Sequence, residues 1–196
     1  MNFTRRSLFL ALAGSSLLVS SKAVFASAPP EDFVHQLGTE VLKLAQGGHR
    51  GDKALQRRFA SLLNRYINIP GVANFALGPA RASLPDGDRG MFYELVSNYA
   101  AALFVWFVQD FQGSDLKISG SSEQGKLTTV ESSIVGTGEQ LKWRVSGAPG
   151  AFRITDINVK GVWLSIAMKD MFEKTLNASH GDFHPLYARL KEAETW

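Results

Sequence analysis

The stretch that most constrains this chain is the run of ten uncharged residues from Tyr99 to Val108. Ten residues are too few to cross a bilayer, which takes about 20. A helix that is apolar on every side is either buried in a core or in contact with something else apolar. The run therefore predicts a core helix, or a helix whose surface is divided between the core and a bound apolar ligand.

On both sides of this run, apolar residues recur at helical spacing. Gly47 and Gly48 end the first helical segment, Asp52 is placed to cap the second, and Pro70 precedes the third. Gly181 ends the helix before the last one, which Asp182 is placed to cap. The pattern predicts helices over residues 31–46, 52–66, 72–77, 91–109, 164–176 and 182–190.

After Gly113 the apolar period changes from 3.6 to 2. Four short segments with strand character follow, separated by turns rich in glycine. They cover residues 115–119, 126–135, 139–146 and 152–159. Neighbouring strands with short loops predict an antiparallel meander with one buried face. The fold class is therefore α+β, with helices packed on one face of an antiparallel sheet.

The first 26 residues have the features of an export signal. Arg5 and Arg6 precede an apolar stretch, Leu8 to Val19, that is too short to anchor the chain in a membrane. The twin arginines favour the twin-arginine route, and an ordinary secretory signal is the alternative. Cleavage after Ala26 leaves residues 27–196 as one domain. In a bacterium with two membranes, either route leads to the periplasm.

Charge and cysteine content exclude several functions for the mature chain. Loss of Arg5, Arg6 and Lys22 leaves 18 of the 21 basic residues, equal to the 18 acidic ones. Nucleic acid is a poor partner for a chain without surplus positive charge. The absence of cysteine excludes disulfides and thiolate metal sites. Basic residues are dense from His49 to Arg65, which is typical of a solvated helix face; a patch for anionic lipid or an acidic partner is the alternative.

No catalytic, metal-binding or cofactor motif is convincing. His180 and His184 flank Gly181, which breaks the helix that would align them, so a helix stop followed by an N-cap is favoured over a metal site. Asp156 lies within an apolar strand, where it is either a general base in a pocket or a structural acid bonded to backbone. We favour the structural role, and we expect no enzyme activity.

One passage resembles a known family. The segment Phe152 to Val162 has an aromatic residue, an aspartate four residues later, and Gly-Val at the entrance to a helix. With Phe75-Ala76-Leu77-Gly78 and Tyr99-Ala100-Ala101-Ala102-Leu103 upstream, and Phe172 and Gly181-Asp182 downstream, the order is similar to the MlaC, or toluene-tolerance, family. A hopanoid-associated, HpnM-like member is also similar. Trp163 departs from the family pattern, in which a small polar residue is common.

The resemblance implies a curved, four-stranded antiparallel sheet wrapped by helices, as in nuclear-transport-factor-like folds. An apolar cavity between sheet and helices would hold phospholipid acyl chains. The partners implied are an inner-membrane ABC transporter with an MCE domain and an outer-membrane lipoprotein–porin complex, and we expect a monomer. Hopanoid is the alternative cargo. An enzyme that uses Asp156 or Tyr99 in the same cavity is the alternative from another class.

The resemblance also indicates which residues would line the cavity. On the long helix, Leu95, Tyr99, Leu103 and Phe107 form a stripe that would face the sheet and the cargo, while Val105 and Trp106 would face other helices. The other predicted lipid-binding residues are Phe75, Val130, Leu141, Trp143, Val145, Ile154, Val162, Leu164 and Met168.

Overall fold

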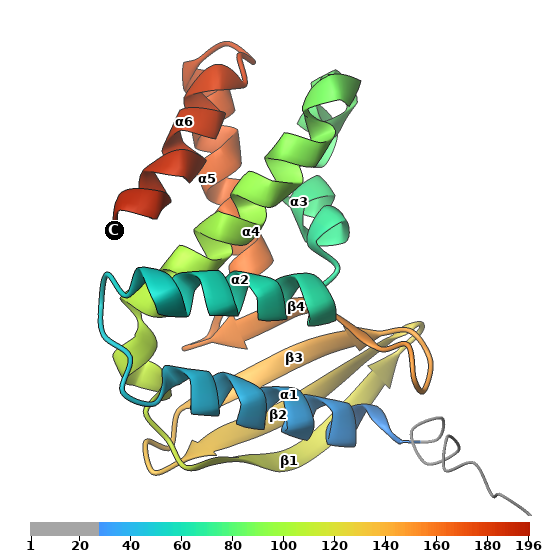
Figure 1. Cartoon of the computed structure of the whole chain (residues 1–196). Coiled ribbons are helices and arrows are strands. Elements are labelled where there is room, and N and C mark those ends of the chain that lie inside the picture. The colour runs from blue at the N-terminus through green and yellow to red at the C-terminus, as the bar shows by residue number, and fades with distance from the viewer. Residues whose placement is uncertain (1–27) are drawn as a thin grey trace, which may run out of the picture.

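The computed structural model describes residues 28–196, so the predicted signal segment and its cleavage point after Ala26 lie outside the described residues. Helices flank one continuous sheet in the chain order (Figure 1). The α-helices are α1 (Pro30–Ala45), α2 (Lys53–Tyr66), α3 (Ile69–Leu77), α4 (Arg89–Trp106), α5 (Leu164–Ala178) and α6 (His184–Glu192). The strands are β1 (Asp115–Gln124), β2 (Leu127–Val135), β3 (Gln140–Ser146), β4 (Arg153–Val159) and β5 (Val162–Trp163). Short 3-10 helices are η1 (Gly78–Ser83), η2 (Asp86–Asp88), η3 (Val108–Phe111) and η4 (Ala193–Thr195).

The sheet is an open antiparallel meander in the order β1-β2-β3-β4-β5, one strand more than the four predicted. The extra strand, β5, pairs Val162 with Val159 and Trp163 with Asn158. Lys160 and Gly161 make the turn between β4 and β5 with positive φ angles of 53° and 83°. Strand β5 has only two residues, which is too few to show the alternation of apolar and polar residues. The sequence therefore indicated only the start of a helix at this point.

Strand β1 is also longer than predicted, because it continues past Ser119 to Gln124. Its second half pairs with β2 after a register shift between Ile118 and Gly120. That half is polar and exposed on both faces, so it lacks the alternation that reveals a strand in a sequence.

The predicted helices are present with shifted ends. Helix α4 ends at Trp106, and η3 continues the chain where the pattern predicted helix up to residue 109. Helix α3 begins at Ile69, before the predicted start. Asp52 caps α2 as predicted, because its carboxylate accepts a hydrogen bond from the Leu55 backbone N–H at 2.8 Å.

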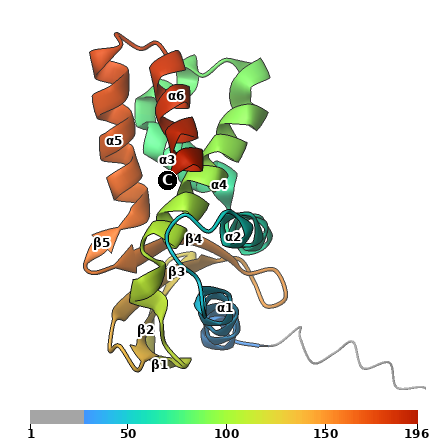
Figure 2. The same ribbon diagram turned by 60° about the vertical axis from the view of Figure 1, so that its left-hand side comes forward.

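Helix α1 lies along β1 and β2, α2 runs alongside α1, and the remaining helices extend away from the sheet (Figures 1 and 2). Gly38 of α1 permits this close approach, since a β-carbon there would clash with the Leu116 side chain of β1. Helix α2 packs on α4 through the rings of Phe59 and Phe104, whose centroids are 3.6 Å apart. Helix α4 in turn packs on α6 and meets α5 at the rings of Phe92 and Phe172.

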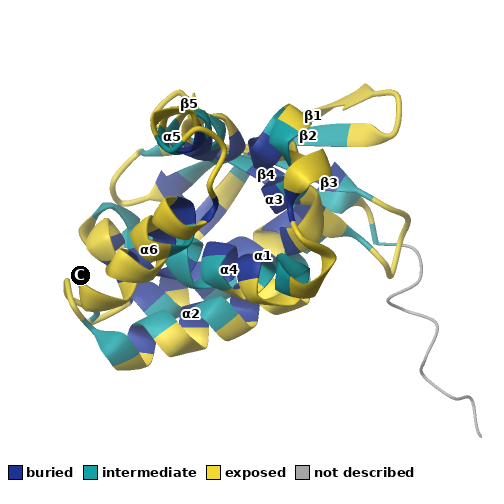
Figure 3. Cartoon of the chain, turned by 90° about the horizontal axis from the view of Figure 1, so that it is seen from above, coloured by how far each residue is buried: buried dark blue, intermediate teal, exposed yellow. Residues whose placement is uncertain are grey.

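Buried residues line the inward sides of the helices and the sheet face beneath them, whereas the tip of the β1–β2 hairpin is exposed (Figure 3). One apolar core cluster joins residues from all the helices named α and from β1 to β4. Within residues 28–196, no helix combines the length and apolar character needed to cross a membrane.

Candidate functional site

The inner face of the sheet is apolar across β2, β3 and β4. Strand pairing places Val130 opposite Trp143 and Val145 opposite Ile154, and all four side chains are buried. The indole N–H of Trp143 donates a hydrogen bond of 2.8 Å to the Ser132 hydroxyl, so this polar group is not left unpaired on the face. The face is a surface on which hydrocarbon can lie without desolvating an unpaired polar group.

The thirteen predicted lipid-binding residues fall into three groups by exposure. Six are buried in the core beneath the helices: Val130, Leu141, Trp143, Val145, Ile154 and Met168. Four are partly buried: Leu95, Tyr99, Leu103 and Leu164. Three are exposed: Phe75, Phe107 and Val162. The structure thus brings the sheet residues and Met168 together in one apolar layer and spreads the others around it.

Coverage of this face is incomplete at the β4–β5 end. Val162 lies on the same face as its pairing partner Val159 and is 51% exposed. The Lys160 ammonium lies 3.0 Å from the Asp110 carboxylate and so ties the β4–β5 turn to η3, which directly follows α4. Leu103 and Phe107, at that end of α4, lie outside the core cluster. We call this region the β4–β5 opening.

Tyr99 lies apart from the sheet residues. Its ring packs edge-on against Trp196, with centroids 5.6 Å apart, at the C-terminal end of the chain. Burial raises the pKa of its hydroxyl. Phe75 lies on α3, which packs on α5, and its ring is half exposed. The stripe predicted on α4 therefore divides, with Leu103 and Phe107 at the β4–β5 opening and Tyr99 at the C-terminus.

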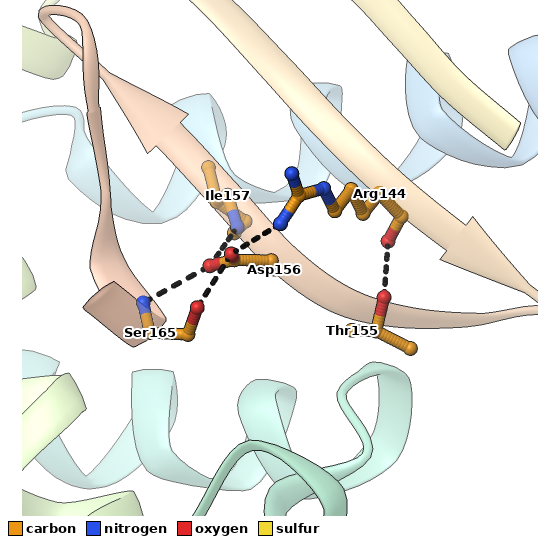
Figure 4. Close-up of polar contacts among 5 residues, drawn as sticks. All are labelled: Arg144, Thr155, Asp156, Ile157 and Ser165. Carbon is orange, nitrogen blue, oxygen red and sulfur yellow. Dashed lines mark hydrogen bonds and ion pairs between the residues drawn. The ribbon is translucent and has the colours of Figure 1, made fainter. Parts of the chain in front are cut away.

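A buried carboxylate fixes α5 to the sheet (Figure 4). Asp156 Oδ1 accepts hydrogen bonds from the backbone N–H groups of Ile157 and Ser165, each at 3.0 Å. Its Oδ2 accepts one from the Ser165 hydroxyl at 2.6 Å and one from Arg144 Nη1 at 3.2 Å. Asp156 is thus bonded to backbone, as favoured from the sequence, and it satisfies the Ser165 N–H in the first turn of α5.

Arg144 and Ser165 were missed in the sequence although both belong to this anchor. Arg144 also covers the Trp163 ring, with its guanidinium carbon 3.8 Å from the ring centre. Arg144 and Asp156 lie opposite each other on neighbouring strands, so their contact can be predicted only when the register of β3 and β4 is known. The larger residue at position 163 therefore serves as a platform for this arginine.

Two surface hollows lie away from the apolar layer. One, of about 480 Å³, lies between the β2–β3 turn and the β4–β5 turn and is lined by residues such as Lys142, Asn158 and Lys160. The other, of about 380 Å³, lies between α5 and α6 near Lys174 and Arg189. Neither is lined by any of the thirteen predicted residues, and polar side chains predominate in both.

The histidine-rich segment forms a helix stop. Helix α5 ends at Ala178, and Gly181 adopts a φ of 90°. The Asp182 carboxylate accepts hydrogen bonds from the His184 backbone N–H and lies 2.8 Å from His184 Nδ1. Phe183, rather than Asp182 as predicted, occupies the N-cap position of α6, and Asp182, one residue before it, accepts from the backbone N–H of the first helical residue, His184. Among residues 28–196, no three His, Asp or Glu side chains are grouped to hold a metal ion.

Comparison with known proteins places the chain in a family. The model for the MlaC protein family matches residues 35–192. Among solved structures, the chain is similar to the phospholipid-binding protein from Ralstonia solanacearum in complex with a phospholipid. The TM-score is 0.69 and the identity 17%, with 85% of this chain and 97% of that chain covered, which shows a shared fold. No curated protein matches the chain. Because the family match spans most of its length, the chain belongs to the MlaC family.

Proposed function

We propose that residues 27–196 form a periplasmic carrier that binds phospholipid acyl chains between the sheet and the helices. The observation that carries this proposal is the apolar inner face of β2, β3 and β4, which is incompletely covered at the β4–β5 opening. Membership of the MlaC family supports it. So does the phospholipid bound to the structurally similar protein from Ralstonia solanacearum.

The physical requirement for such a carrier is a replacement for the membrane interior. Each CH2 group exposed to water costs about 0.8 kcal/mol, so a soluble carrier has to cover most of each chain. Helix α4 has 18 residues, which gives a length of roughly 27 Å at 1.5 Å per residue. One leaflet of the hydrocarbon core is roughly 15 Å deep. The helix is therefore long enough to wall a site for an acyl chain.

Entry at the β4–β5 opening accounts for the placement of three predicted residues. Leu103, Phe107 and Val162 lie there with apolar surface that the core does not cover. A chain that enters at this point would pass along Val159 towards Trp143 as α4 moves away from the sheet. Binding of this kind needs no catalytic group, so Asp156 and Ser165 act only as an anchor for α5.

Transport would require contact with two membranes. The partners we propose are an inner-membrane ABC transporter with an MCE domain and an outer-membrane lipoprotein–porin complex, with the carrier a monomer between them. The mature chain carries 18 basic and 18 acidic residues once Arg5, Arg6 and Lys22 are removed. A carrier without net charge can leave a membrane surface readily. Hopanoid remains the alternative cargo.

Native mass spectrometry of the purified protein tests the binding function. We expect the protein to retain phospholipid, and lipid extraction will distinguish glycerophospholipid from triterpenoid. Leu103→Asp should abolish loading, because it places a charge at the opening without removing a core residue. Met91→Asp is the matched control on α4, since Met91 is 46% exposed and far along the helix. A folded Leu103→Asp protein that loads normally, or an unmodified protein that never holds lipid, would contradict the proposal.

A further inference from the structure

Helix α2 presents a strongly basic outer face. It contains Lys53, Arg57, Arg58 and Arg65 and no acidic residue, and Arg50 lies three residues before its start, ahead of the N-cap Asp52. The apolar residues of α2 are buried against the core, so its cations lie on the side that faces solvent. We call these five cations the α2 basic face.

Arg50, Arg57, Arg58 and Arg65 form no ion pair among the described residues. Among residues 28–196, no Asp or Glu carboxylate lies within ion-pair distance of the five side chains, although Lys53 Nζ lies 2.7 Å from the backbone oxygen of Trp196, the last residue of the sequence. The nearest acid in sequence, Asp52, is engaged by the Leu55 backbone N–H, and the carboxylate of Glu194 accepts a hydrogen bond from Asn98. Since the mature chain has no net charge, the face represents a separation of charge across the molecule.

An exposed tryptophan borders the basic face. The Arg50 guanidinium lies 4.6 Å from the centre of the Trp106 ring and donates a 3.0 Å hydrogen bond to the Trp106 carbonyl. Trp196 packs on the same ring, and Lys53 Nζ donates to the Trp196 carbonyl at 2.7 Å. Trp106 is nonetheless 39% exposed. Rigidly held tryptophan next to cations is typical of surfaces that lie at the membrane–water interface.

We propose that the α2 basic face and Trp106 dock the protein on an anionic membrane surface. Charge complementarity identifies the occupant, because anionic headgroups attract clustered Lys and Arg, and an indole inserts at headgroup level. The face shares no residue with the β4–β5 opening. A variant can therefore lose membrane docking and keep lipid loading, or the reverse. Experiment can also distinguish a membrane from an acidic protein as the binding partner.

The test is binding of the purified protein to vesicles, measured by flotation. Vesicles of phosphatidylcholine alone are compared with vesicles that also contain phosphatidylglycerol. We expect binding only to the anionic vesicles, weakened at high salt because exposed charges are screened. Arg57→Glu with Arg58→Glu should reduce that binding at least about 25-fold, at about fivefold per cation. Trp106→Ser should reduce it further.

The matched control is Lys174→Glu with Lys191→Glu, which changes net charge equally on exposed residues of α5 and α6. It should retain most of the vesicle binding. Circular dichroism melting curves confirm that each variant folds, and native mass spectrometry follows lipid loading separately. Equal losses in both double variants, equal binding to neutral vesicles, or no vesicle binding at all would overturn the proposal, and the last would favour an acidic protein as the occupant.

Discussion

The two ends of the sheet's inner face differ in how they are closed. At the β1 end, α1 lies directly on the strands, Gly38 allows the close approach, and Leu116 and Ile134 are almost fully buried. At the β4–β5 end, Val162 is half exposed, and polar contacts rather than close packing hold the elements together. The same apolar face is thus sealed by packing at one end and by polar contacts at the other.

This difference indicates which end can open. Separating close-packed apolar surfaces exposes hydrocarbon and costs free energy in proportion to area. Separating a surface ion pair such as Lys160–Asp110 costs little, because water replaces the lost partner. The β1 end is therefore a fixed wall, and the β4–β5 end is where η3 and the end of α4 can move away from the sheet while Asp156 holds α5 in place.

The largest effect should come from Asp156, which anchors α5 beside the opening. Asp156→Ala leaves the N–H and hydroxyl of Ser165 without their acceptor and should lower the free energy of unfolding by about 3 kcal/mol. Urea unfolding measures the loss. Asp170→Ala, at an exposed position of α5, is the control and should change stability by less than about 0.5 kcal/mol. Equal effects would show that the anchor does not hold α5.

Two valines contrast the sealed layer with the opening directly. Val130 is fully buried and Val162 is 51% exposed, yet both lie on the inner face. Val130→Ala should cost about 2 kcal/mol through lost burial and the cavity it leaves. Val162→Ala should cost less than about 0.5 kcal/mol but weaken lipid retention. Equal stability of the two variants in thermal unfolding would contradict this difference between the buried layer and the opening.

Tyr187 provides a reference outside both ends. It joins α6 to η2 through a 3.0 Å hydrogen bond to Asp88. Burial and that hydrogen bond raise the pKa of Tyr187 to about 12, above its usual value of 10.0. The folded state therefore holds this proton more tightly, so the stabilisation is complete below pH 10 and is lost between pH 10 and 12.

Tyr187→Phe should remove this part of the alkaline decline, by about 1 kcal/mol after allowance for solvent screening. The measurement is the free energy of unfolding of both proteins from pH 9 to 12. Parallel curves for the variant and the unmodified protein would contradict the assignment of the pKa shift to Tyr187.

The smallest effect on stability is expected from Lys160. Lys160→Ala removes the exposed ion pair with Asp110 and should leave the melting temperature unchanged. Release of bound phospholipid to acceptor vesicles should become several-fold faster, because no ion pair then holds the β4–β5 turn to η3. Lys142→Ala is the control, since it removes an exposed ion pair with Glu131 elsewhere on the sheet. Equal release rates for both variants would place the exit elsewhere.

Local pattern predicted most of the fold. The alternation of Leu141, Trp143 and Val145 identified the inner face, and Asp52 identified a helix start, because these signals lie within a few residues. The two-residue β5 and the polar half of β1 carry no such signal. Their pairing is set by neighbouring strands, so the sequence predicted four strands where five are present.

The site was less accessible to sequence reasoning than the fold. Helical spacing grouped Tyr99 with Leu103, but the C-terminal Trp196 occupies the side of α4 where Tyr99 lies. The anchor of Arg144, Asp156 and Ser165 joins three elements and requires the register of β3 and β4. The spacing of residues along one helix does not indicate which other element packs against each of its faces.

The most direct test of acyl-chain binding at the inner face is quenching of single tryptophans by a phospholipid with brominated acyl chains. Trp143 lies on the inner face, whereas Trp106 lies beside the α2 basic face. Two variants each retain one of these residues, with the remaining tryptophans replaced by phenylalanine. Loading one lipid per protein, without vesicles, should quench Trp143 strongly and leave Trp106 unchanged. Quenching of Trp106 with Trp143 unaffected would contradict the account.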